Sequence, residues 1–285
     1  MANDLDSLFQ AAVNAIDEGD ILLLRKLLDD HPQLATNRLV KPGQWLLDDI
    51  GPALDSFFKD PYLLWFVSED APRRNKLPAN IVDLAIIIIK KAKSFNVKSV
   101  PEQLDYALRL VAWSPVARKC KVQLPLIKLL VDEGAKMDGV PDDALVNGNS
   151  EAAKYLIQLG ATMTLATAFC LGDWDRAAQL AATSTGSERQ FSLVLSALNG
   201  NAEAVARIIG YGGITIDRPS PHLYSHATAL HHAVWSCSLD TVKCLINAGA
   251  RTDIRDTIYN GTPLDWAVHA GSKEIEKYLR QLSHS

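Results

Sequence analysis

The 285-residue chain has little of several features that define common classes of protein. It has only four cysteines, and none forms a Cys-x-x-Cys pair or a disulfide framework, so we expect small core or turn residues in a reducing compartment. The longest apolar stretch, 84–89, is far shorter than the roughly 20 residues of a membrane span. The first residues lack the basic and apolar regions of a signal peptide. These absences predict a cytoplasmic protein without a membrane segment.

Sequence motifs of catalysis are also missing. The chain contains no nucleophile elbow, phosphate-binding loop or zinc-hydrolase motif. Pairs of carboxylates such as Asp132 and Glu133 fall at expected turns or helix ends, where acids cap helices or face solvent. We therefore predict that the protein is not an enzyme and uses no cofactor.

The chain does contain an internal repeat. The segments 228–234 and 262–268 are near-copies that lie 34 positions apart, and the match continues from 238–246 to 272–280. A period of this length is typical of stacked repeat proteins. Each copy holds two apolar stripes separated by a turn, which predicts two helices per repeat. Thr228 and Thr262 stand at N-cap positions, with His231 and Asp265 placed three residues later to complete a capping box.

These copies resemble the ankyrin repeat family, whose consensus reads Thr-Pro-Leu-His, a turn glycine, a second helix, then Gly-Ala-Asp and a β-hairpin finger. Ala229, Asp265 and Cys237 depart from the consensus proline, histidine and turn glycine. The resemblance implies an all-α, ankyrin-type α-solenoid of about eight helix-turn-helix repeats. Short β-hairpin fingers are expected mainly at the C-terminal end, and the divergent repeats look more similar to bacterial members than to eukaryotic ones.

We expect a single ankyrin repeat domain over 1–285, because each unit of a solenoid packs only on its neighbours. The expected repeats cover residues 5–35, 61–95, 103–138, 140–162, 163–187, 190–218, 227–256 and 261–282. The non-repeat insert 36–60 is expected to form a short helix from Pro52 to Phe58 that covers an end or flank of the stack. The spacing of turn glycines predicts little or no hairpin in the middle repeats and one long finger at 214–226.

The resemblance also implies a binding surface, because the concave face of ankyrin repeats is built from finger tips and from residues just before the turn. The residues that fall there in the last repeats are predicted to bind a partner: Trp235, His269, Tyr224, Tyr259, Leu198 and Ser236. Tryptophan and tyrosine dominate protein-binding hot spots. The alternative is that these aromatics only cover the ends of their own helices.

A basic segment gives a second candidate surface. Residues 71–121 carry eleven Lys and Arg against three acidic residues. The two long turns of this segment would form a patch for an anionic partner, made of Arg73, Arg74, Lys76, Arg118, Lys119 and Lys121. A charged edge that only faces solvent is the alternative. Recognition of nucleic acid is not expected, because the segment has no nucleic-acid motif and few aromatics.

Four histidines, at 222, 226, 231 and 232, lie close together in the sequence. Imidazole is a common metal ligand, but no Cys or carboxylate lies between 222 and 232 to complete a tetrahedral set, so we predict no metal site. The predicted function is a non-enzymatic, monomeric protein-interaction scaffold that binds an unidentified protein or peptide. The alternative is a protein that binds a metal through the His-rich finger or an anionic ligand through the basic turns.

Overall fold

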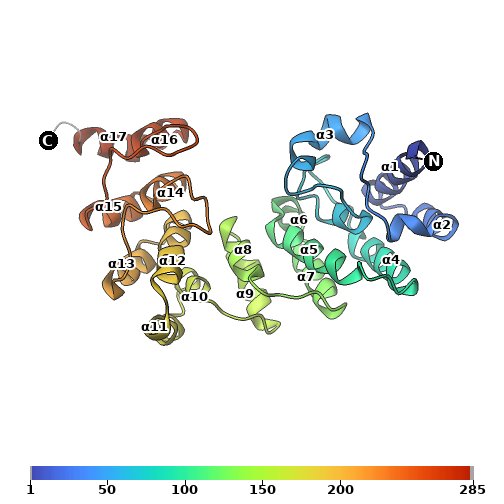
Figure 1. Ribbon diagram of the computed structural model, residues 1–285, viewed down its shortest axis with the longest axis horizontal. Helices are drawn as coiled ribbons and strands as arrows, with labels where there is room; N and C mark the ends of the chain where they lie inside the picture. Colours follow the sequence, from blue (N-terminus) through green and yellow to red (C-terminus); the bar gives the residue numbers. More distant parts are fainter. Residues whose placement is uncertain (1, 283–285) are drawn as a thin grey trace. The chain divides into compact units, whose positions relative to one another are not determined.

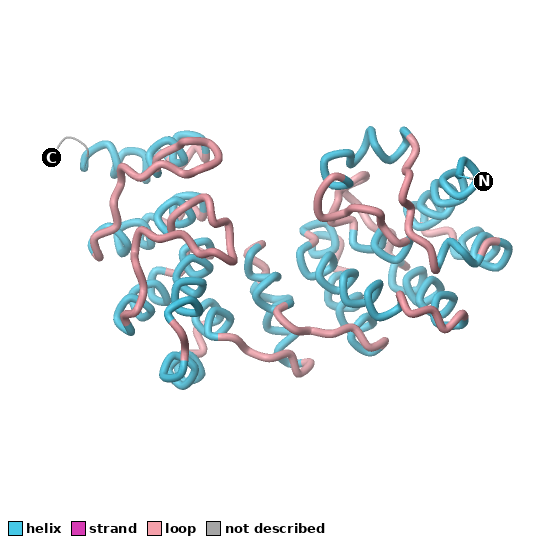
Figure 2. The backbone as a smooth tube through the Cα atoms, viewed as in Figure 1, coloured by secondary structure: helices cyan, strands magenta, loops and turns pink. Residues whose placement is uncertain are grey.

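A computed structural model describes residues 2–282, with side chains from residue 5 onward. Over this range the chain forms 17 α-helices and two 3₁₀-helices, and it contains no β-strand (Figure 2). The predicted all-α fold is therefore confirmed. None of the helices in this range is long and apolar enough to cross a membrane.

The chain divides into two compact units. Unit 1 comprises Met1–Ala144 with Tyr155–Thr162, and unit 2 comprises Leu145–Lys154 with Met163–Ser285. The helices α8 (Val140–Val146) and α9 (Ser150–Gln158) contribute residues to both units.

Unit 1 contains three helix pairs and an inserted helix. The first pair is α1 (Ala2–Glu18) and α2 (Ile21–Asp30), the second is η2 (Leu63–Ser68) and α4 (Ile81–Ser94), and the third is α5 (Val100–Trp113) and α7 (Gln123–Asp132). Between the first two pairs lie η1 (Pro32–Ala35) and α3 (Gln44–Leu54), and within the third pair, between α5 and α7, lies α6 (Pro115–Lys119). The first helix of the second pair is a 3₁₀-helix, and its six residues are all buried.

The helix α3 differs from the helix that was predicted for the insert. It begins at Gln44 rather than at Pro52, and Pro52 lies inside it, just after a non-helical residue, Ile50 (φ −136°, ψ 27°). Proline interrupts the hydrogen bonds of the preceding turn, which accounts for the kink. The start of α3 is fixed to α1, because Asp6 accepts hydrogen bonds from the Gly43 amide (2.7 Å) and the Trp45 indole (2.9 Å).

Unit 2 contains four successive helix pairs, which are drawn from yellow to red in Figure 1. They are α10 (Leu165–Leu171) with α11 (Trp174–Thr183), α12 (Gly186–Leu198) with α13 (Ala202–Tyr211), α14 (Ala229–Trp235) with α15 (Leu239–Asn247), and α16 (Pro263–His269) with α17 (Lys273–Leu282). The first helices pack on one another in the order α10, α12, α14, α16, and α13, α15 and α17 follow in the same way. This arrangement is the helix-turn-helix stack that the 34-residue period predicted.

The turns between paired helices repeat one local design. A residue in the left-handed conformation, such as Gly172 (φ 73°) or Gly200 (φ 64°), ends the first helix. The next residue, Asp173 or Asn201, then caps the second helix through its side chain. Gly200 is required for a further reason, since a Cβ there would lie 2.9 Å from the Cβ of Ser238 in the next turn.

The predicted β-hairpin fingers are not supported. Between α13 and α14 the described residues show only turns and one isolated bridge, Ser220 with Leu223. Between α15 and α16 the backbone makes a hairpin-like bond from the Asp256 amide to the Gly261 carbonyl (2.9 Å). The Asp256 carboxylate accepts the neighbouring amides, so a side chain takes the place of a strand ladder.

Candidate functional site

Unit 2 contains a pocket of about 850 Å³, and half of the residues that line it carry aromatic rings. We refer to it as the aromatic pocket. Its rings are Tyr224, His226, His232, Trp235, Tyr259, Trp266 and His269. The remaining lining residues are Val146, Asn147, Gly148, Leu198, Ser236, Gly261 and Asp265. All of them belong to unit 2.

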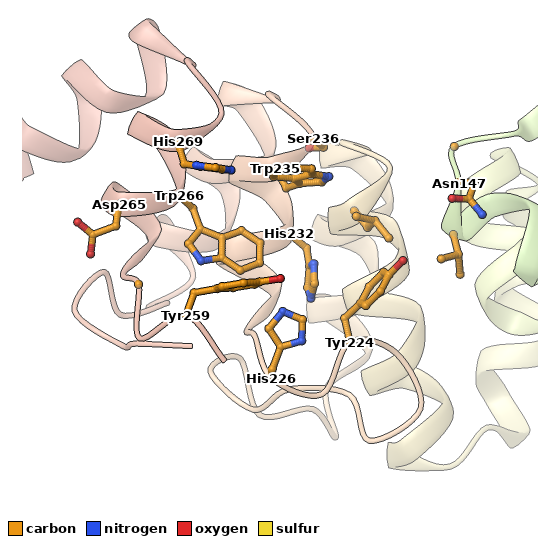
Figure 3. A pocket seen from close by; sticks show the side chains of 14 residues that line it. Asn147, Tyr224, His226, His232, Trp235, Ser236, Tyr259, Asp265, Trp266 and His269 are labelled. Carbon is orange, nitrogen blue, oxygen red and sulfur yellow. The ribbon is translucent and has the colours of Figure 1, made fainter. Parts of the chain in front are cut away.

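The rings form one connected cluster. The Trp235 ring stacks on His269 at a centroid distance of 6.4 Å and meets Trp266 edge-on at 6.2 Å. Around the Trp266 indole lie His226 at 6.0 Å and His232 at 6.1 Å. The two tyrosines complete the cluster, with Tyr224 at 5.7 Å from His232 and Tyr259 at 6.1 Å from His226. Figure 3 shows these side chains converging, whereas the Asp265 carboxylate points away from them.

The repeat explains why the helices bring these rings together. His232 and Trp266 occupy equivalent positions in α14 and α16, and so do Trp235 and His269. Positions three apart share one face of a helix, so each helix contributes two rings to the pocket. Because α14 packs on α16, the four rings meet.

The six residues predicted to bind a partner all line this pocket. That they bind one stays a prediction. Trp266, His232 and His226 also line the pocket and were not among the residues predicted from the sequence. Two of these could have been predicted, because His232 and Trp266 lie three residues before Trp235 and His269 and so share their helix faces. The third, His226, lies in an irregular loop and has no such signal.

The loops of the pocket are held by buried polar groups. Asp256 is 3% exposed and accepts hydrogen bonds from the amides of Ile258, Tyr259 and Gly261 and from the Trp266 indole (3.0 Å). Burial alone would raise the pKa of this carboxyl, but these four donors lower it to about 2. Asp256 is therefore a fixed negative charge at the Nε1 edge of the Trp266 ring. The Thr257 amide also donates to the His226 carbonyl (2.9 Å). This bond joins the loop between α15 and α16 to the loop between α13 and α14.

His231 has a structural role, as its consensus position implied. It is fully buried, its Nδ1 lies 2.8 Å from the Thr228 hydroxyl, and its Nε2 lies 3.1 Å from the Gly261 carbonyl. The capping boxes predicted at Thr228 and Thr262 are both present. Burial lowers the pKa of His231. The side chain thus braces α14 against the next loop as a neutral imidazole.

His232 differs from His231 because one of its ring nitrogens has no partner. The residue is 2% exposed, and Nε2 is buried without a hydrogen bond. Burial and the neighbouring histidines lower its pKa to about 4, while a hydrogen bond with the Tyr224 backbone opposes this shift. Because Nε2 is unpaired, we assign the ring proton to Nδ1, on the side of the Tyr224 carbonyl that raises the pKa. Nε2 is then a bare acceptor.

The basic turns do not form a uniform patch. The Arg73 side chain is 3% exposed and pairs with Asp17 (2.7 Å) and Glu69 (3.0 Å), so it is unavailable to a partner. Arg74 pairs with Asp17 (3.1 Å) and Glu18 (3.0 Å). The other members, Lys76, Arg118, Lys119 and Lys121, are exposed. The burial of Arg73 was not visible in the sequence because its partners lie in α1 and at Glu69, on different elements.

The clustered histidines do not assemble a set of metal ligands. Among residues 2–282, no group of three or more His, Cys, Asp or Glu is placed to hold a metal ion. His226 and His232 meet edge to face at 6.4 Å between ring centroids, and His231 is used in the capping box.

Comparison with known families agrees with the helix pairs of unit 2. A family model described as ankyrin repeats (3 copies) matches residues 193–284. This part of the chain is therefore built of ankyrin repeats. Ankyrin repeats are generally protein–protein interaction modules and are typically non-enzymatic. No curated protein matches the sequence. The matched repeats contain α14 and α16, which carry the four central rings of the aromatic pocket.

Proposed function

We propose that this protein is a non-enzymatic, monomeric scaffold of the cytoplasm that binds a partner protein or peptide through the aromatic pocket of unit 2. One observation carries the proposal. Trp235 is 53% exposed and Tyr259 is 74% exposed, although both belong to a connected cluster of rings in a pocket. Large aromatic side chains are usually covered, and an exposed cluster of them marks an interaction site.

The composition of the pocket supports a protein partner. Tryptophan and tyrosine are the residues most enriched among binding hot spots, because they contribute a large rigid contact area at a small cost in conformational entropy. Leu198 adds an apolar side chain to the lining, and Ser236 and Asn147 add polar ones. Aromatic residues together with some polar groups are the usual composition of a protein interface.

The hydroxyl geometry of the pocket supports a role without catalysis. The Ser236 hydroxyl donates to the carbonyl of Ala233 (2.8 Å) and not to a histidine. An activated serine requires a base within hydrogen-bond reach. The pocket lining within the described range therefore presents no serine–histidine pair for nucleophilic attack.

A pull-down from lysate of the source organism tests the proposal. The bait is the wild-type chain beside a Trp235→Ala/His269→Ala double variant whose melting temperature matches that of wild type. We expect a specific partner to bind wild type and to be lost from the double variant. The control is Trp174→Ala, which removes a tryptophan of unit 2 that stacks on Arg207 outside the pocket. The control should retain the partner. A partner that remains bound to the double variant would place the binding surface outside the aromatic pocket.

A further inference from the structure

The rings of the aromatic pocket present a negative electrostatic surface. The face of an aromatic ring attracts a cation, and the indole of tryptophan does so most strongly. The negative potential of the Trp266 ring is strengthened, because its Nε1–H donates to the ionised Asp256 carboxylate at 3.0 Å. A negative charge at the edge of the ring makes its face more negative.

No positive side chain competes for this surface. The residues that line the pocket include no Lys and no Arg. Arg255, which precedes Asp256, pairs with the outward-pointing Asp265 (3.6 Å) and with the Asn260 carbonyl. The charge of the pocket thus complements a cationic group.

The floor of the pocket also has an unmet hydrogen bond. His232 is 2% exposed and its Nε2 is an acceptor with no donor. Leaving a buried acceptor unsatisfied is unfavourable, and native proteins have few such groups. A ligand that carries N–H donors would satisfy it, whereas an apolar ligand would not.

We propose that the aromatic pocket receives an arginine side chain of a partner peptide, with the guanidinium lying on the Trp266 ring, beside the nearly perpendicular Trp235 ring, and donating a hydrogen bond to Nε2 of His232. This inference rests on the proposed function and specifies the chemistry of the partner. The exposed rings of Tyr224 and Tyr259 line the same pocket and contact the apolar stem of the arginine.

Arginine fits better than the other cationic side chains. Its guanidinium is planar, stacks on aromatic faces and carries five donors at its edge, so that one group can satisfy both the rings and His232. Lysine is more strongly hydrated and offers no flat face for stacking. A trimethylated lysine has the charge but no donor for Nε2, and a leucine has neither.

Titration of the full-length chain with short peptides tests the proposal. The probes are an acetylated and amidated Gly-Gly-Arg-Gly-Gly peptide and the same peptide with citrulline, trimethyllysine or leucine in place of arginine. Citrulline keeps the shape of arginine and removes its charge. Binding is followed by NMR at the indole N–H resonances of Trp235 and Trp266. We expect the arginine peptide to bind at least about fivefold more tightly than the citrulline peptide, as a cation–π contact implies.

Two variants locate the effect. Trp235→Ala is expected to weaken binding of the arginine peptide, whereas Trp174→Ala, the control outside the pocket, leaves it unchanged. His232→Phe keeps a ring of similar size but removes the acceptor, so it should reduce the preference for arginine over trimethyllysine. Thermal melts confirm that each variant is folded.

Each remaining outcome would overturn the inference. Equal binding of the citrulline and arginine peptides would show that charge does not matter. Tighter binding of the leucine peptide would show an apolar specificity, and in that case the proposed function would survive without the arginine. If no peptide shifts the indole resonances, the arginine inference fails at this site. The proposed function is then decided separately by the pull-down with the double variant.

Discussion

Cys237 is strained at a turn where three other repeats of unit 2 use glycine. It adopts a left-handed conformation (φ 57°), whereas Gly172, Gly200 and Gly271 occupy the equivalent turns at φ 64–73°. A residue with a Cβ pays a steric penalty in this region that glycine does not. We expect Cys237→Gly to raise the free energy of unfolding by about 0.5 to 1 kcal/mol.

Thermal and denaturant melts measure this change, with Cys237→Ala as the matched control. The alanine keeps the Cβ and therefore the strain, while it removes the same contact between the thiol and the Ser272 hydroxyl. If both variants change the stability equally, the thiol contact and not the backbone strain determines the effect.

Asp70 is a second residue in an unfavourable environment, because its burial disfavours the charged form of the carboxyl. Burial raises the pKa of its carboxyl to about 7. No hydrogen bond or ion pair to this carboxylate occurs among residues 5–282, and its own amide bonds to the Ser68 hydroxyl (3.2 Å). Since the folded pKa lies above the unfolded value of 3.8, ionisation of Asp70 destabilises the fold as pH rises from about 4 through 7.

The expected result is that Asp70→Asn stabilises the protein at pH 8 by on the order of 2 to 4 kcal/mol and has little effect near pH 4. Melting temperatures of wild type and variant across this pH range measure the difference. A constant difference at all pH values would mean that the amide, rather than the missing charge, is responsible.

At the scale of the helix pair, the same position can differ in burial between repeats. Leu230 in α14 is 1% exposed, because α12 and α16 pack on both sides of its helix. Leu264 is its equivalent in α16 but is only half-buried. We expect Leu230→Ala to lower the free energy of unfolding by about 2 to 5 kcal/mol, and Leu264→Ala to lower it by clearly less, about 1 to 2 kcal/mol. Denaturant melts that gave equal losses would show that repeat register alone, and not burial, sets the cost.

The regular elements of unit 2 could be predicted from the sequence because their information is local. The 34-residue period, the N-cap threonines and the turn residues each act within a few positions, and they place α14 to α17 correctly. The prediction of β-hairpin fingers failed because the Asp256 side chain takes the place of the strand ladder, which the family consensus could not reveal. The start of α3 was missed for a similar reason, since Asp6 of α1 fixes it from a distance.

The candidate site was only partly predictable. The repeat period identified Trp235 and His269, because their positions follow from alignment of the turns. His226 was missed because an irregular loop sets its place, through the bond from the Thr257 amide. Arg73 was assigned to an exposed patch because a charge run does not reveal that Asp17 and Glu69 enclose one of its members. In each case, the structure differs from the prediction because of a contact between elements that lie far apart in the sequence.

At the scale of the whole molecule, the two units carry buried ionisable groups of opposite kinds. In unit 1, burial raises the pKa of Asp70 and of Asp143, so a lower pH stabilises the folded state of this unit. In unit 2, burial lowers the pKa of His231 and His232, so that acid opposes folding. Because contacts in a repeat stack are local, different parts of the chain can respond separately.

We therefore expect a shift from pH 7 to pH 5 to stabilise unit 1 and to destabilise unit 2. Over this interval Asp70, with a pKa of about 7, takes up a proton in the folded state only, whereas His232, with a pKa of about 4, takes one up in the unfolded state only. Each change amounts to about 2 kcal/mol by proton linkage, or roughly 30-fold in the opening equilibrium. Hydrogen exchange corrected for intrinsic rates, read at amides of α5 and α7 and of α12 and α14, measures the two units in one experiment. Asp70→Asn should remove most of the response of unit 1, and His232→Phe should reduce that of unit 2. Protection that changed in the same direction in both units would contradict the assignment, because it would mean that the buried carboxyl and the buried imidazole do not control their local stability.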